Sequence, residues 1–264
     1  MIPSMELPLV FFTLLSQLAI GLTLLYALRT AGPSVQPEAS AKTQWFVFAG
    51  ILAFSLIVSL THLGHPLLAP RAVLNLSTAW LSWEILIFIL LFALMAATAY
   101  LGVTRRFVWL TAATGFVALF VQGMVYSPSS FPAIHNVLPF AFFLVTAVIL
   151  GAGTSAWFAP QDTQPLLRWI LVGALSAGLL LFLVAPCVWL SGGIVMRLTG
   201  LAYLASPLYW AHIVLGLAVP MAVVVVSRRI PSWLPILLLA GALCGRVVFY
   251  LDTIHTGVNI GGLQ

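Results

Sequence analysis

The sequence has 264 residues, of which 62% are hydrophobic and only 6% are charged. A soluble fold carries about a quarter charged residues, so this chain lacks the polar surface of a soluble protein and is expected to be integral to a lipid bilayer. The basic residues that give its net charge of +5 lie at the ends of apolar runs and form no basic stripe. This distribution argues against a nucleic-acid partner.

Eight apolar runs follow one another along the chain, each close to the ~20 residues that a helix needs to cross a bilayer. They lie at roughly 7–28, 44–63, 79–101, 107–126, 137–158, 167–190, 207–227 and 232–251. Glycine and proline mark the joints, and the runs lack the alternation of barrel strands. We predict an all-α integral membrane protein, a bundle of eight transmembrane helices that forms a single membrane-anchor domain over residues 1–264. The first run lacks a basic stretch before it and a cleavage motif after it, so we expect it to be retained.

Eight spans place both termini on the same side of the membrane. Most of the basic residues belong to loops on the opposite side, namely Arg29, Lys42, Arg105, Arg106, Arg168, Arg228 and Arg229. Because basic residues accumulate in cytoplasmic loops, we predict that both termini lie on the outer, periplasmic side.

The histidines fall at or near this predicted outer side: His62, His65, His135, His212 and His255. Imidazole is the side chain that titrates near neutral pH. His62 is expected in the last helical turn of the second run, because Gly64 predicts the end of that helix and His65 precedes a proline. Whether the other four histidines are functional is left open.

One carboxylate lies inside an apolar run. If the third helix begins near Ser77 or Thr78, Glu84 is about 9–10 Å below its start, where a carboxyl group must be neutral or paired. The eighth run contains Arg246, with Asp252 six residues beyond it. Ionisable groups within the membrane mark functional sites. A single outer loop joins the second and third runs, so we predict that His62 and Glu84 meet; the alternative is that His62 only reaches to the membrane surface.

The stretch THLGHPLLAPRAVLNLSTAWLSWEI, residues 61–85, resembles the membrane anchor subunits of dimethyl sulfoxide reductase-type molybdoenzymes. The matching positions are His62-Leu63-Gly64, Pro66, Asn75, Trp80-Leu81-Ser82 and Glu84-Ile85. YSPSSFPAIHN and GRVVFY are similar to the family's loop between the fourth and fifth spans and to its last helix. Three positions depart from the family's usual pattern. Trp83 stands where Arg is frequent, His135 stands where Trp is frequent, and no acidic residue shortly precedes Gly245-Arg246.

The resemblance implies a subunit that oxidises menaquinol to menaquinone and passes electrons to a ferredoxin-like partner with four [4Fe-4S] clusters. That partner would supply a molybdopterin catalytic subunit, which reduces an acceptor such as dimethyl sulfoxide; N-oxides, selenate and sulfur oxyanions remain open. It also implies a bacterial cytoplasmic (inner) membrane location, partners docked on the periplasmic face and no haem. We expect no metal site and no iron–sulfur cluster in this chain, because Cys187 and Cys244 lack metal-ligand spacing.

The resemblance associates His62 and Glu84 with quinol oxidation. A neutral His62 imidazole would accept a proton from a quinol hydroxyl, and Glu84 would relay a proton to the outer side. Residues expected to bind the quinol are Arg246, Trp80, Asn75, Tyr126 and Tyr250.

Three other functions remain open on the sequence. A haem b-type quinol-oxidising cytochrome would use His62 and His212 as facing ligands. A proton-translocating subunit would carry ionisable groups across the bilayer midplane, whereas here they gather at one face. The third alternative is a purely structural anchor without quinone chemistry.

Overall fold

The computed structural model describes residues 7–31, 40–61 and 75–257. Within these ranges the regular elements are helices, and eight helical stretches are long and apolar enough to cross a membrane. The predicted all-α bundle of eight candidate spans is therefore confirmed. The main elements are α1 (Leu7–Arg29), α2 (Ala41–Leu60), α3 (Trp80–Leu101), α4 (Arg105–Val125), α5 (Leu138–Ser155), α6 (Gln164–Leu190), α7 (Ile194–Ala205), α8 (Pro207–Ala211), η3 (His212–Ala218), α9 (Val219–Ser227) and α10 (Leu234–Leu251).

The seventh span is not one regular helix. It begins as α8, continues as the π-helical segment η3, and returns to α-helix in α9. Pro207 occupies the first turn of α8, where its missing N–H costs no hydrogen bond. The short helix α7 fills the connection before it, which the sequence pattern did not predict.

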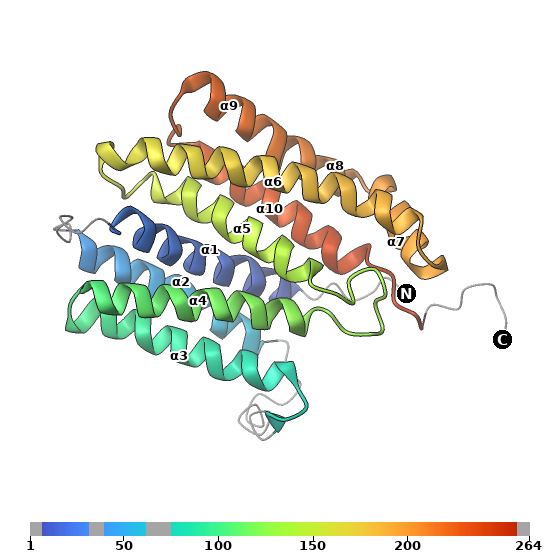
Figure 1. The fold of residues 1–264 in the computed structure, drawn as a ribbon, viewed down its shortest axis with the longest axis horizontal. Coiled ribbons are helices and arrows are strands. Elements are labelled where there is room, and N and C mark those ends of the chain that lie inside the picture. Colours follow the sequence, from blue (N-terminus) through green and yellow to red (C-terminus); the bar gives the residue numbers. More distant parts are fainter. Residues whose placement is uncertain (1–6, 32–39, 62–74, 258–264) are drawn as a thin grey trace.

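The chain runs back and forth along the long axis, so that consecutive spans are antiparallel (Figure 1). In this view α3 and α4 lie on one side, α6 and α9 lie on the other, and α1 and α5 lie between them. Helix α1 is buried over most of its length and contacts α2, α4, α5 and α10. Gly21 and Gly151 let α1 and α5 approach closely, since a Cβ on Gly21 would lie 1.9 Å from the Ala147 carbonyl oxygen. Small residues serve this purpose between membrane helices.

The two ends of the bundle differ in charge. At one end α1, α3, α5 and α9 finish and α2, α4, α6 and α10 begin. The seven basic residues assigned above to the cytoplasmic loops belong to these helix ends and to the connections between them. We call the opposite end, where α3 and α5 begin and α4 and α10 finish, the outer end, after the predicted orientation.

Candidate functional site

Glu84 lies one turn inside α3 near the outer end. The structure begins α3 at Trp80, so Glu84 is about 6 Å below the helix start, which is shallower than the sequence predicted. Its side chain is only 6% exposed. The Gln122 side chain is the hydrogen-bonding neighbour of the carboxyl group, while Oε1 has no hydrogen-bond partner among the described residues.

A pair of buried amides connects Glu84 to the first helix. Gln17 of α1 donates from Nε2 to Gln122 Oε1 on α4 over 3.1 Å, and Gln122 donates from Nε2 to Ser16 Oγ over 3.2 Å. All three side chains are fully buried. An amide nitrogen carries two hydrogens, so the Gln122 amide can serve Ser16 and the Glu84 carboxyl together. Because the Gln122 amide oxygen accepts from Gln17 and its nitrogen donates to Ser16, these contacts fix the orientation of the Gln122 amide.

Arg246 of α10 completes this series of contacts from the other side. Its Nη2 donates to Gln17 Oε1, and its guanidinium lies 4.2 Å from the centre of the Phe143 ring, a favourable cation–π distance. Arg246 is thus connected to Glu84 through two amides. Asp252, six residues further on, instead interacts with Ser206, and burial raises the pKa of its carboxyl while that hydrogen bond lowers it.

Tyr126 and Tyr250 lie beside these polar groups at the outer end. Their rings meet edge to face with centres 5.6 Å apart, and their hydroxyls interact. Both are close enough to Glu84 and Arg246 to respond to their charges. Tyr250 donates its own hydrogen to the Leu9 carbonyl oxygen over 3.5 Å, so in this pair the Tyr126 hydroxyl donates and the Tyr250 oxygen accepts. We call Glu84, Gln122, Gln17, Arg246, Tyr126 and Tyr250 the polar cluster.

The structure brings four of the predicted site residues together: Glu84, Arg246, Tyr126 and Tyr250. Trp80 lies one turn before Glu84, is 45% exposed, and packs edge-on against Phe120 with ring centres 6.2 Å apart. Asn75 is exposed in the turn before α3, where its backbone carbonyl accepts hydrogen bonds from the N–H groups of Thr78 and Ala79. Asn75 is therefore not part of the polar cluster.

The predicted catalytic residue His62 lies outside the described residues, as does His65. The structure describes α2 as far as its C-cap, Thr61. The meeting of His62 and Glu84 therefore stays a prediction from the sequence.

The glutamines that link the cluster were not predicted from the sequence. Gln17 stands in an apolar run as LLSQLAI, and Gln122 stands in another as FVQGM. A polar amide in a membrane span needs a partner on another helix, and this was the signal that could have found them. Which two glutamines meet depends on which helix faces touch, and that is a property of the fold.

The three described histidines bond to groups outside the cluster, although His212 and Arg246 line the same small cavity. His135 Nδ1 is 2.9 Å from the Ser127 carbonyl oxygen, and His255 packs edge-on against Phe131; both are exposed at the outer end. His212 is buried with Nδ1 2.8 Å from the Gly241 carbonyl oxygen. The cavity at its ring is about 10 Å³, which has room for about one water molecule and not for a porphyrin. This packing disfavours His212 as a haem ligand.

A larger apolar groove of about 750 Å³ lies between α5 and α6, with Met196 of α7 at one end. No titratable side chain lines it. Ala141 and Val145 of α5 face the groove, whereas Phe143, two residues from each, faces Arg246. The groove therefore lies on the opposite face of α5 from the polar cluster. Within the described ranges, no three His, Cys, Asp or Glu side chains are grouped so that they could hold a metal ion.

Comparison with known proteins agrees with the resemblance seen in the sequence. Residues 2–251 match the family described as DMSO reductase anchor subunit (DmsC). The protein is also 30% identical over 155 residues to the C subunit of the anaerobic dimethyl sulfoxide reductase of Haemophilus influenzae. That alignment covers 55% of this sequence and 56% of the relative, so the match spans about half the length of each. Because the family match extends over nearly the whole sequence, the chain belongs to the DMSO reductase anchor subunit family.

Proposed function

We propose that this chain anchors a respiratory molybdoenzyme in the bacterial inner membrane and oxidises menaquinol there. Electrons pass to an iron–sulfur subunit with four clusters, and from it to a molybdopterin subunit that reduces an acceptor such as dimethyl sulfoxide. Family membership supports the anchor role. The observation that carries the quinol chemistry is the polar cluster, in which a buried carboxyl group and a buried guanidinium share two amides beside two tyrosines.

Oxidation of a quinol releases two electrons and two protons, so the site must bind an apolar ring and accept protons from its hydroxyls. Glu84 has the chemistry of a proton acceptor, with Oε1 unbonded among the described residues and Gln122 orienting the carboxyl group. Proton transfer requires such a group within hydrogen-bonding reach of the hydroxyl. From its place in the sequence, His62 is the acceptor for the second proton.

Arg246 suits a quinone oxygen, and the tyrosines suit the quinone ring. The guanidinium donates several hydrogen bonds in a fixed plane, and one of them is already used by Gln17. The remaining donors can orient a quinone carbonyl oxygen. The rings of Phe143, Phe249 and Tyr250 pack around Tyr126 and offer aromatic faces and edges to a quinone ring.

The placement of the cluster has an energetic consequence. Glu84 and Tyr126 both lie near the outer end, so protons are released on the periplasmic side. If the partner subunits dock on that face, the acceptor consumes protons on the same side, and turnover moves no net charge across the membrane. Quinol-driven turnover in sealed vesicles is therefore expected to generate no membrane potential.

The direct test is Glu84→Gln in the complex produced with its partner subunits. We expect quinol-driven reduction of the acceptor to fall by about 100-fold or more, the usual effect of losing a proton-transfer group. Reduction driven by a dye that donates directly to the partner subunits should persist. Thr98→Val is the matched control, because Thr98 is buried near the other end of the same helix. Quinol-driven turnover that survives Glu84→Gln at the control's rate disproves the proposal.

A further inference from the structure

The π-helical segment η3 packs against a flat face of α10 made by two glycines one turn apart. A Cβ on Gly241 would lie 2.1 Å from the Gly216 Cα, and a Cβ on Gly245 would lie 2.8 Å from the His212 ring. The backbone of η3 and the imidazole therefore rest directly on the backbone of α10. Single π-helical turns in membrane and soluble helices often accompany a specific site, and here the turn begins at His212.

The hydrogen bond of His212 determines what its second ring nitrogen can do. Nδ1 lies 2.8 Å from the Gly241 carbonyl oxygen, and because a carbonyl only accepts, Nδ1 carries the hydrogen. In the neutral ring, Nε2 is then a hydrogen-bond acceptor. The residues that line the cavity include Arg246 and no acidic group, so nothing there favours the charged ring. His212 is 5% exposed, and Nε2 has no partner in the part of the chain that the structure describes.

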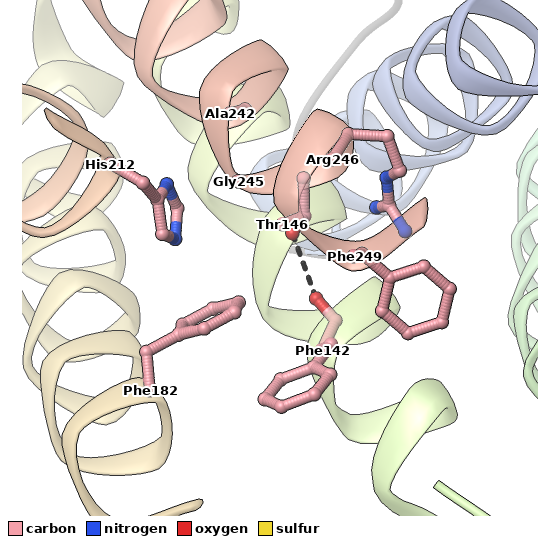
Figure 2. Close-up of a pocket in the computed structure, with 8 residues that line it drawn as sticks. All are labelled: Phe142, Thr146, Phe182, His212, Ala242, Gly245, Arg246 and Phe249. Atoms are coloured by element: carbon pink, nitrogen blue, oxygen red, sulfur yellow. Dashed lines mark hydrogen bonds between the residues drawn. The ribbon is translucent and has the colours of Figure 1, made fainter. Parts of the chain in front are cut away.

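His212 lines a cavity of about 10 Å³, enough for a single water molecule. Figure 2 shows the imidazole and Thr146 on opposite sides of this space, with Phe142 and Phe182 beside it. The Arg246 guanidinium points away from His212, on the other side of α10. Thr146 Oγ1 donates its hydrogen to the Phe142 carbonyl oxygen over 2.8 Å, so its lone pairs remain free to accept. The cavity thus presents two acceptors and needs a ligand with two hydrogens to donate.

We propose that this cavity binds one water molecule, which donates one hydrogen bond to His212 Nε2 and the other to Thr146 Oγ1. The water satisfies the buried ring nitrogen, which apolar contacts leave unsatisfied. It also connects the seventh span to α5 across the edge of α10, so that three helices meet at one hydrogen-bonded joint. This water bridge needs no quinone chemistry and is independent of the proposed function.

The test uses the full chain in lipid nanodiscs with ¹⁵N-labelled histidine. The chain has five histidines, and His212 is assigned from the signals missing in His212→Gln. We expect Nδ1 to be protonated and Nε2 to show the signal of a hydrogen-bonded acceptor. Thr146→Val should remove the bridge and shift the Nε2 signal to higher frequency, towards an unbonded ring nitrogen. Thr146→Ser, which keeps the hydroxyl, and the distant Thr98→Val should leave the signal in place.

A measurement on the unmodified chain keeps the proposal testable if a variant fails to fold. Magnetisation should pass from water protons to the His212 ring and not to a buried ring away from the cavity, such as Phe88. A proton on Nε2, no transfer from water to the ring, or an Nε2 signal that is unchanged in a folded Thr146→Val protein would each overturn the proposal.

Discussion

The two faces of α10 bury polar groups in opposite ways. On the face towards α1, Arg246 is surrounded by side chains: the Gln17 amide, the Phe143 ring and the nearby tyrosines. On the face towards η3, His212 is held by backbone, with its ring on Gly245 and its Nδ1 at the Gly241 carbonyl oxygen. Side chains can rotate and exchange partners when a substrate arrives or a proton moves, whereas backbone packed on glycine cannot. The first face suits chemistry and the second suits a fixed joint.

The largest effect is expected from Gly241→Ala, which should disturb the packing on both faces of α10. Its Cβ would lie 2.1 Å from the Gly216 Cα, so α10 must move away from η3, and overpacking of this kind costs about 1–3 kcal/mol or more. The yield of folded chain and its thermal unfolding midpoint should both fall. Gly173→Ala is the control, since a Cβ there meets nothing within 4 Å. Equal stability of the two variants would contradict the packing described for α10.

Arg246→Lys should disturb only the contacts on the face of α10 towards α1. Lysine keeps the charge but lacks the planar donors of the guanidinium, and loss of a charge-assisted hydrogen bond of about 1.5 kcal/mol corresponds to roughly tenfold in rate. We expect quinol-driven turnover to fall about tenfold in an assembled complex, with dye-driven turnover unchanged. Arg168→Lys, at the opposite end of the bundle, serves as control. If both variants turn over quinol equally, Arg246 has no role at the site.

The amide pair of Gln17 and Gln122 allows the coupling between two helices of the polar cluster to be measured as a free energy. Gln17→Leu and Gln122→Leu should each lower the free energy of unfolding by about 1 kcal/mol, with a coupling of about 0.6 kcal/mol in the double variant, as for other hydrogen bonds between membrane helices. Steric trapping in bicelles measures these values. The ¹⁵N signals of His212 should not change, because the histidine lies on the other face of α10. A shift of those signals would show that the two faces are not independent.

Trp80→Ala should have the smallest effect. The indole is 45% exposed, and Trp80 lies one turn before Glu84 in α3. We therefore expect the KM for quinol to rise about threefold, within the range of one aromatic contact, with kcat nearly unchanged. Trp169, 63% exposed at the opposite end, provides the control variant. Steady-state kinetics with a soluble quinol analogue separates the two constants. A fall in kcat instead would place Trp80 in the chemical step.

The eight spans were predictable because length and hydropathy alone decide whether a segment crosses a bilayer. Glu84 and Arg246 were predictable as charges within apolar runs, and the structure brings them to one cluster through two glutamines that were not predicted. The predicted depth of Glu84 was wrong because α3 begins at Trp80, after a turn around Asn75.

The link through Gln17 and Gln122 depends on which faces of α1 and α4 touch, a long-range property that hydropathy does not contain. The π-helical turn at His212 likewise depends on the glycine face of α10. No pattern within the seventh run itself predicts it. Contacts between elements distant in sequence therefore account for the features that were not predicted.

The enclosure of α1 also bears on how the protein is made. Gln17 bonds to residues that follow it by 105 and 229 positions, so the ribosome synthesises α1 long before the helices that satisfy it. Until α4 and α10 emerge, the amide must be shielded by the insertion machinery, by water at the membrane surface or by transient neighbours. The contacts of α1 are consequently complete only after the last span has inserted. Truncation before α10 leaves α1 without the guanidinium that bonds to its Gln17 oxygen.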